Sequence, residues 1–409
     1  MELFFAGRQP YDYPTQSIRA RRFIAGSRGR NGCGGISVGK KRSRRGRWAW
    51  ADGWRTARKE GDGLLSLSFN LSTLVAKQFL SRRAFQKFQE ETGLGDLSWR
   101  VVYACGSRRK PLPLREHLKQ HQGGIVFVHG WDGSGAIWEN LPALVCQANP
   151  RLVALIPDVN GFGGTPFLDE VPRVAHCSPK GLIHAVELWL GLVHFRADRG
   201  RRSRRPLIFV GHSMGGAALF YKTEKGWENQ PYGLCAVAPA LLHNDGLRKG
   251  FYVTLGVGIG AGLQLDFMDR FKDKLAPRVI EALIEGASRT VKREHRRIFA
   301  NTPKGTLAQT FYALGVAEEK VQRTTWDNFR VILGHRDRLV GVAPMLELLE
   351  SLGLGSDNIR VVLGDHYFFS YGKGSPREHA RNREILLEEI LTLYERVRRG
   401  RLATDKDSS

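Results

Sequence analysis

Short apolar segments alternate with longer amphipathic segments through much of the sequence. The apolar segment "GGIVFVHG" (residues 123–130) precedes the helical pattern "PALVCQA", and "PLIFVG" (206–211) follows the helical pattern of residues 178–197. Buried strands that alternate with helices are typical of a parallel sheet covered on both faces. We therefore expect an α/β fold, with a mostly parallel sheet flanked by helices. The expected strands lie within residues 97–106, 123–130, 151–159, 206–211, 232–241, 328–340 and 358–368.

The alternation stops after residue 241 and resumes near residue 323. Residues 242–322 have helical character and no convincing strand. We interpret them as a helical cap inserted into an α/β core, which then comprises residues 97–241 and 323–398. Within this cap, residues 250–267 are apolar and rich in glycine, which favours a mobile apolar segment. Membrane contact and ordinary packing are the alternatives for it.

The two ends of the chain differ in composition from this core. Residues 1–62 contain twelve Arg and three Lys against five acidic residues, within a total formal charge of +23. We expect a basic and mostly disordered arm here, although its charge also suits contact with a polyanion or an anionic membrane surface. Residues 63–96 are expected to form an N-terminal helical segment, because apolar residues recur at helical spacing within residues 72–95. Residues 399–409 are expected to form a C-terminal tail.

Composition favours a cytoplasmic protein without disulfides, metal sites or cofactors. No stretch of about 20 uninterrupted apolar residues is present, so no membrane-spanning helix is expected. The twin arginine at residues 21–22 lacks the following apolar region that an export signal needs. The cysteines are odd in number and have no C-x-x-C spacing, which suits a reducing compartment. They are Cys33, Cys105, Cys146, Cys177 and Cys235.

The segment "GHSMGG" places Ser213 directly after an apolar strand and before a run of small residues. A G-x-S-x-G segment between a strand and a helix forces the serine onto a sharp turn and exposes its hydroxyl at the carboxyl end of the sheet. Gly211 and Gly215 suit this turn, because side chains at their positions would clash. Ser213 is therefore the candidate nucleophile. The backbone N–H of Met214, near the helix N-terminus, is a candidate oxyanion donor.

A serine hydroxyl needs a base to become reactive, and the base needs an orienting acid. Both groups are expected just past the ends of later strands. Asp337 in "GHRDRLV" and His366 in "GDHYFF" lie at such positions. They predict a triad in the chain order Ser213, Asp337, His366. Asp158, at the end of "LIPDV", is the alternative acid.

A second oxyanion donor is expected in "VFVHGWDGSG". Gly130 permits a tight bend after the strand, and the backbone N–H of Trp131 can then point toward the nucleophile. The indole of Trp131 fits either a pocket wall or the hydrophobic core, and the sequence leaves both interpretations open.

Together these segments resemble the α/β-hydrolase family, in its capped form with a serine nucleophile. The resemblance spans roughly residues 97–398 and rests on "HGWDGSG", "DVNGFGGT", "GHSMGG", "GHRDRLV" and "GDHYFF" in the family's order. It implies the α/β-hydrolase fold, with a helical cap that follows the strand after the nucleophile. Dehalogenases and epoxide hydrolases of this family use an aspartate as nucleophile, so the serine disfavours those activities. The implied site is Ser213 as nucleophile, Asp337 as acid, His366 as base, and the N–H groups of Trp131 and Met214 as oxyanion hole.

The first hypothesis for function is a serine hydrolase that cleaves an ester or related acyl bond of a small molecule. The apolar cap suggests a hydrophobic substrate. Carbon–carbon bond hydrolysis, thioester hydrolysis and acyl transfer to an alcohol use the same motifs and stay open. Two alternatives come from other classes: a non-catalytic binding protein on the same scaffold, and a polyanion-binding protein that uses residues 1–62.

Overall fold

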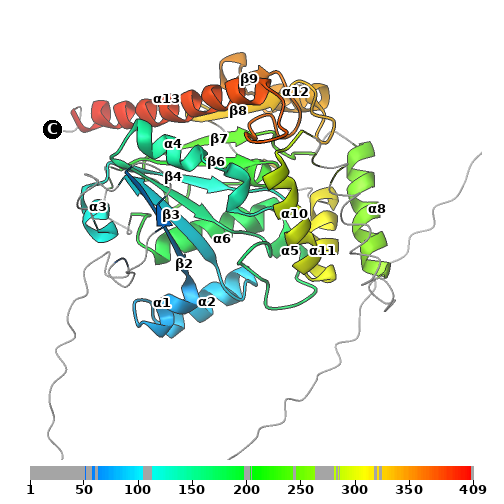
Figure 1. The fold of residues 1–409 in the computed structure, drawn as a ribbon, viewed down its shortest axis with the longest axis horizontal. Coiled ribbons are helices and arrows are strands. Elements are labelled where there is room, and N and C mark those ends of the chain that lie inside the picture. The colour runs from blue at the N-terminus through cyan, green and yellow to red at the C-terminus, as the bar shows by residue number, and fades with distance from the viewer. Residues whose placement is uncertain are drawn as a thin grey trace, which may run out of the picture. The chain divides into compact units, whose positions relative to one another are not determined.

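The computed structural model describes most of the chain beyond residue 62 (Figure 1). All described residues belong to one compact unit, Arg45–Ser409. The basic arm predicted for residues 1–62 lies almost wholly outside them. The described residues are 51, 58–59, 63–104, 113–197, 203, 205–242, 246–262, 281, 284, 286–316, 320–321 and 325–406.

The strands of the described residues form one nine-stranded sheet in the order β1-β2-β3-β5-β4-β6-β7-β8-β9. Strands β1, β2, β3 and β5 pair antiparallel in that sequence. Every pairing from β5 to β9 is parallel, which confirms the prediction of a mostly parallel sheet. The strands are β1 (Arg58–Lys59), β2 (Leu64–Asn70), β3 (Ser98–Ala104), β4 (Gly123–Val128), β5 (Leu152–Pro157), β6 (Leu207–His212), β7 (Tyr232–Val237), β8 (Phe329–Gly334) and β9 (Ile359–Val362).

Helices cover both faces of the sheet. Successive side chains of a strand point to opposite faces, so a strand of consecutive apolar residues needs packing partners on both. Ile125 and Phe127 of β4 join one buried cluster, together with residues of α4 (Leu141–Ala148) and α13 (Glu378–Lys406). Val126 and Val128 join the other cluster, with residues of α6 (Pro179–Leu192) and α7 (Met214–Phe220). Figure 1 shows α4 and α13 on one side of the sheet and α6 on the other. The remaining elements outside the β7–β8 connection are α1 (Leu71–Ala76), α2 (Arg82–Thr92), α3 (Leu114–Gln120), α5 (Val174–Cys177), α12 (Val342–Ser351) and the 3-10 helices η2 (Gly135–Trp138) and η3 (Ser356–Asn358).

The connection between β7 and β8 contains α8 (Gly246–Gly262), α10 (Arg289–Asn301) and α11 (Lys304–Val316), and no strand among its described residues. Glycines let α8 and α11 approach closely: a Cβ on Gly256 would lie 2.7 Å from Tyr312 N, and one on Gly315 would lie 2.6 Å from Val253 Cγ2. These helices group at one end of the sheet (Figure 1). The predicted limits of the cap, residues 242–322, stay a prediction.

The two ends of the described chain differ from the sequence expectation. Residues 63–96 were expected to be helical, yet β2 occupies Leu64–Asn70 and pairs with β3. Its alternating sequence "LLSLSFN" has the period of a strand, with Leu65, Leu67 and Phe69 in the same buried cluster. At the other end, α13 continues to Lys406, through most of the tail expected at residues 399–409. The Leu, Ala and Lys in this stretch are good helix formers, so the single Gly400 does not end the helix.

Two further sequence expectations concern cysteines and membranes. Cys146, Cys177 and Cys235 are free and buried, whereas Cys33 and Cys105 lie outside the described residues. Burial raises the pKa of the Cys146 thiol to about 12. Within the described ranges, no helix combines the length and apolar character that crossing a bilayer requires.

Candidate active site

Ser213 lies on the turn between β6 and α7 and adopts the backbone angles φ 55° and ψ −119°. A positive φ is rare for a residue with a side chain, and such strain concentrates at functional sites. The prediction that glycines are needed on both sides is confirmed. A Cβ on Gly211 would lie 2.3 Å from Gly215 O, and one on Gly215 would lie 2.5 Å from His129 O.

The loop after β4 packs directly against this turn. A Cβ on Gly130 would lie 2.7 Å from Ser213 Cβ and 3.3 Å from Ser213 Oγ, so only glycine fits there. This contact places the following residue, Trp131, beside the serine. Among the described residues, the backbone N–H groups of Trp131 and Met214 donate no hydrogen bond within the loops and turns. Met214 is also the first residue of α7, where an amide has no intrahelical acceptor.

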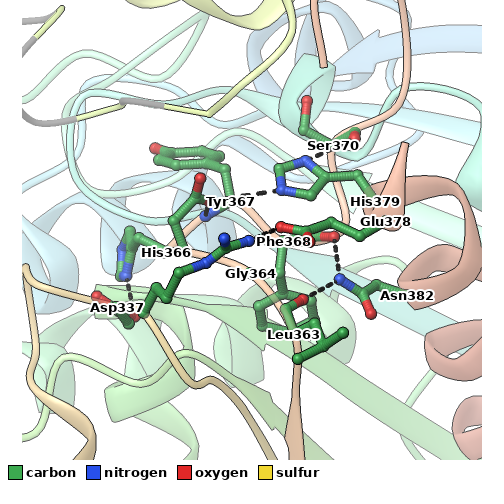
Figure 2. A network of polar contacts seen from close by, with 12 residues as sticks. Asp337, Leu363, Gly364, His366, Tyr367, Phe368, Ser370, Glu378, His379 and Asn382 are labelled. Carbon is green, nitrogen blue, oxygen red and sulfur yellow. Dashed lines mark hydrogen bonds and ion pairs between the residues drawn. The ribbon is translucent and has the colours of Figure 1, made fainter. Parts of the chain in front are cut away.

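Asp337 and His366 form a buried hydrogen-bonded pair at the ends of β8 and β9. His366 Nδ1 lies 2.8 Å from Asp337 Oδ2, as Figure 2 shows. The other carboxylate oxygen, Oδ1, accepts hydrogen bonds from the backbone N–H groups of Leu339 (3.0 Å) and Val340 (3.2 Å). Because a carboxylate only accepts hydrogen bonds, His366 Nδ1 carries a proton and donates it to Asp337.

The turn that carries His366 is held from two directions. From α13, Asn382 Nδ2 donates to Phe368 O at 3.0 Å and also contacts Leu363 O (Figure 2). From β6, His212 Nε2 lies 3.0 Å from His366 O. Burial lowers the pKa of His212 well below its usual value, so its neutral imidazole donates from Nε2 to this carbonyl. These contacts fix the direction of the His366 side chain.

One pocket brings the sequence-predicted residues together. Trp131, Ser213 and His366 all line it, whereas the remaining lining is mostly apolar. The free volume of this pocket is about 30 Å³, room for one or two water molecules. Because Trp131 lines this pocket, its indole forms part of the pocket wall. The indole Nε1 donates to Thr310 Oγ1 at 2.9 Å, and the ring centre lies 3.8 Å from that of Phe311. The other lining residues are Ala240, Tyr252, Ile284, His295, Phe311, Leu314, Leu339 and Tyr367.

The structure does not join all three residues of the predicted triad by hydrogen bonds. His366 Nε2 has no hydrogen-bond partner among the described residues, so the bond to Ser213 Oγ is not formed. Catalytic hydrogen bonds are often long in proteins without substrate and shorten when it binds. The geometry thus provides an oriented base and a nearby serine within one pocket.

Other polar residues that the sequence raised as candidates have structural contacts. Asp158, the alternative acid, accepts hydrogen bonds from Gly135 N (2.9 Å) and Gly164 N (2.8 Å). It therefore fastens the loop after β4 to the loop after β5. Clusters of His, Cys, Asp or Glu side chains suited to a metal ion do not occur in the described part of the chain.

Three buried polar residues at the pocket were not singled out from the sequence: Asp132, His295 and Tyr367. His295 of α10 has Nε2 3.0 Å from the Tyr367 hydroxyl and Nδ1 3.4 Å from Asp132 Oδ2. The only sequence signal was the position of two of them, because Asp132 follows Trp131 and Tyr367 follows His366. Nothing in the sequence pointed to His295, which lies in a helix of the β7–β8 connection.

These features define a class of protein: an α/β fold with a parallel sheet covered on both faces, and a serine on a strained turn from strand to helix. The model of the alpha/beta hydrolase family matches residues 125–377, more than half of the chain. The chain belongs to the alpha/beta hydrolase family, as its motifs predicted. Membership of this family supports a hydrolase. No curated protein matches the sequence.

Several solved structures match this chain at low sequence identity. An esterase from Exiguobacterium antarcticum is 13% identical, with 68% of this chain and 93% of that chain covered and a TM-score of 0.47. A thermophilic esterase from Thermogutta terrifontis is 14% identical, with coverage of 74% and 94% and a TM-score of 0.47. A laboratory-evolved variant of potato epoxide hydrolase is 14% identical, with coverage of 75% and 97% and a TM-score of 0.48.

Proposed function

We propose that this protein is a serine hydrolase that cleaves an ester or a related acyl bond through Ser213, His366 and Asp337. The observation that carries the proposal is the 2.8 Å contact between His366 Nδ1 and Asp337 Oδ2, beside a pocket that Ser213 and His366 both line. The positive φ of Ser213 supports it, because this conformation turns the hydroxyl out of the strand.

In the proposed reaction, Ser213 Oγ attacks the carbonyl carbon while His366 Nε2 takes its proton. The carbonyl electron pair moves onto oxygen, where the N–H groups of Trp131 and Met214 stabilise the negative charge. When the carbonyl re-forms, the alcohol leaves with the proton from His366, and an acyl-enzyme remains. Water then attacks the acyl carbon and gives a proton to His366, which passes it to the departing Ser213 oxygen. Asp337 stabilises the imidazolium in both halves of the reaction.

The pocket lining supports a hydrophobic acyl substrate. Apart from Ser213, His366 and His295, the lining consists of aromatic and aliphatic side chains. Contact with such a surface stabilises apolar substrate groups by about 25 cal/mol per Å². The small free volume suits a narrow acyl group, and a longer one requires the lining side chains to move apart.

The proposal is tested by labelling the protein with a fluorophosphonate, which reacts covalently with an activated serine. The wild type is expected to be labelled, and the variant Ser213→Ala is not. A panel of p-nitrophenyl esters of increasing chain length then measures the preferred acyl group. An unlabelled but folded wild type overturns the proposal and favours a non-catalytic binding protein.

The same panel separates hydrolysis from related reactions of the proposed enzyme. Release of free acid in water supports ester hydrolysis, and a new ester formed from an added alcohol indicates acyl transfer. Thioester and β-diketone substrates test the two other reactions that the motifs allow. We also propose that the protein works in the cytoplasm, and that residues 1–62 make weak contact with polyanions or membrane surfaces. Removal of residues 1–62 tests the role of this arm. The shortened protein is expected to lose salt-sensitive binding to polyanions and to keep its activity.

A further inference from the structure

Three buried polar side chains that do not belong to the proposed triad form a row of contacts at the candidate active-site pocket. Asp132 comes from the loop after β4, His295 from α10, and Tyr367 from the turn after β9. Their exposed fractions are 0%, 2% and 4%. Three elements far apart in the sequence thus contribute one polar group each to a single row of contacts.

The direction of the hydrogen bond between Tyr367 and His295 follows from the groups around His295. Asp132 Oδ2 lies 3.4 Å from His295 Nδ1, and a carboxylate favours a proton on the facing nitrogen. Burial lowers the pKa of His295 to about 4, so the imidazole is neutral at pH 7 and its Nε2 carries a lone pair. The Tyr367 hydroxyl, 3.0 Å away, therefore donates its proton to Nε2.

This arrangement leaves the Tyr367 oxygen with its lone pairs available as hydrogen-bond acceptors. The phenol also keeps its proton, since burial raises the pKa of Tyr367 well above its usual value. Tyr367 and His295 line the same pocket as Ser213 and His366, among mostly apolar side chains. An acceptor in an apolar wall discriminates between ligands, because a ligand without a matching donor buries it unpaired.

We propose that the Tyr367 oxygen accepts a hydrogen bond from a hydroxyl group of the substrate, and that Asp132 and His295 hold Tyr367 in place for this contact. The inference rests on the proposed function and adds the substrate class: an ester that carries a free hydroxyl near its scissile carbonyl. That hydroxyl belongs either to the acyl chain or to the alcohol part. Tyr367 is then a specificity-determining residue, and His295 is a positioning residue that acts through it.

The test compares esters that differ by one hydroxyl group. The acyl arm uses the p-nitrophenyl esters of butyrate, 2-hydroxybutyrate and 3-hydroxybutyrate. The alcohol arm uses propyl butyrate and glyceryl butyrate. The wild type is expected to prefer the hydroxylated ester in one arm, by about threefold to tenfold in kcat/KM, and that arm identifies where the hydroxyl lies.

Two substitutions of tyrosine form a matched pair. Tyr367→Phe is expected to bring the ratio of kcat/KM between the paired esters close to one. Tyr371→Phe, at an exposed tyrosine four residues further on, is expected to keep the wild-type ratio. A purely structural role of Tyr367 lowers kcat/KM for both esters by the same factor, and that result overturns the proposal.

Substitutions at His295 provide a second measurement, should Tyr367→Phe fold poorly. His295→Leu removes the acceptor of the Tyr367 proton and is expected to reduce the selectivity ratio. His295→Gln retains an acceptor oxygen and is expected to restore part of the ratio. A wild type that shows no preference in either arm contradicts the inference. If that wild type is still labelled by the fluorophosphonate, the hydrolase proposal stands and only this inference fails.

Discussion

His212 and His366 are hydrogen-bonded to each other, with His212 Nε2 3.0 Å from the carbonyl oxygen of His366. Their rings lie 4.7 Å apart. The residue just before the proposed nucleophile thus holds the backbone of the proposed base. This contact couples the turn after β6 to the turn after β9, so the distance between Ser213 and His366 depends on it.

Replacing His212 by alanine is expected to reduce both stability and activity. The substitution leaves the buried carbonyl of His366 without its donor and creates a cavity, which lowers the free energy of unfolding by about 3 kcal/mol. Urea unfolding and ester kinetics measure the two effects. His184→Ala, at a half-exposed histidine of α6 that lies 3.7 Å from Glu91, is the control and is expected to change either quantity little. Full activity of the His212 variant would show that the contact does not position the base.

Replacing Asp337 by asparagine is expected to lower kcat about 10⁴-fold, because an amide no longer enforces the proton on His366 Nδ1. Steady-state kinetics with a p-nitrophenyl ester measures this loss. The matched variant Asp158→Asn changes the acid that binds Gly135 and Gly164, and we expect its kcat to stay within about tenfold of the wild type. The reverse order of the two losses would assign the acid to Asp158.

Replacing Gly130 by alanine is expected to abolish the proposed esterase activity in a protein that still folds. The new methyl group would lie 2.7 Å from Ser213 Cβ and 3.1 Å from His212 O, so it displaces the serine from its turn. Overpacking of this kind costs about 1–3 kcal/mol of stability. Thermal unfolding together with fluorophosphonate labelling checks both parts. As a control, Gly191→Ala in α6 meets no atom within 4 Å and is expected to stabilise the helix by about 0.5–1 kcal/mol.

The stability of the protein is expected to fall as the pH drops from about 6.5 to about 4. The pKa of His295 is about 4 in the folded protein, against 6.5 in an exposed histidine, because burial disfavours its charged form. Between these values the unfolded chain binds more protons, so acid favours unfolding. The contribution of His295 to the free energy of unfolding is fully present above about pH 6.5. About 3 kcal/mol of it is lost by pH 4.

Urea unfolding at pH 7, 6, 5 and 4 measures this dependence. Burial also lowers the pKa values of His117, His129 and His212, so a slope persists in any single variant. His295→Gln cannot take up a proton and is expected to have a shallower slope than the wild type. An unchanged slope in this variant would show that His295 is not the group that titrates.

Much of the fold and three residues of the candidate site could be predicted because their signals are local. A buried strand needs consecutive apolar residues, and the turn at Ser213 needs glycines at residues 211 and 215, so both leave marks within a few positions. The expectation that Ser213, Asp337 and His366 lie close together follows from the rule that the carboxyl ends of parallel strands meet at one edge of a sheet.

Strand β2 shows where a local pattern was present and misjudged. Its sequence "LLSLSFN" alternates as a strand does, but the helical spacing that follows it in residues 72–95 led to the expectation of one helical segment. The extension of α13 is a milder case, because helix ends depend on weak preferences of single residues.

The row formed by Asp132, His295 and Tyr367 was decided by tertiary structure alone. His295 reaches the pocket only because α10 packs over the loop after β4, and 163 positions separate it from Asp132 along the chain. The sequence by itself determined the parallel part of the sheet, the strained serine turn and the order of the proposed triad residues, since each depends on neighbouring residues or on strand ends. Only the packing of helices onto that sheet decided which polar side chains face one another inside the pocket, because side-chain convergence depends on the docking of distant segments rather than on local pattern.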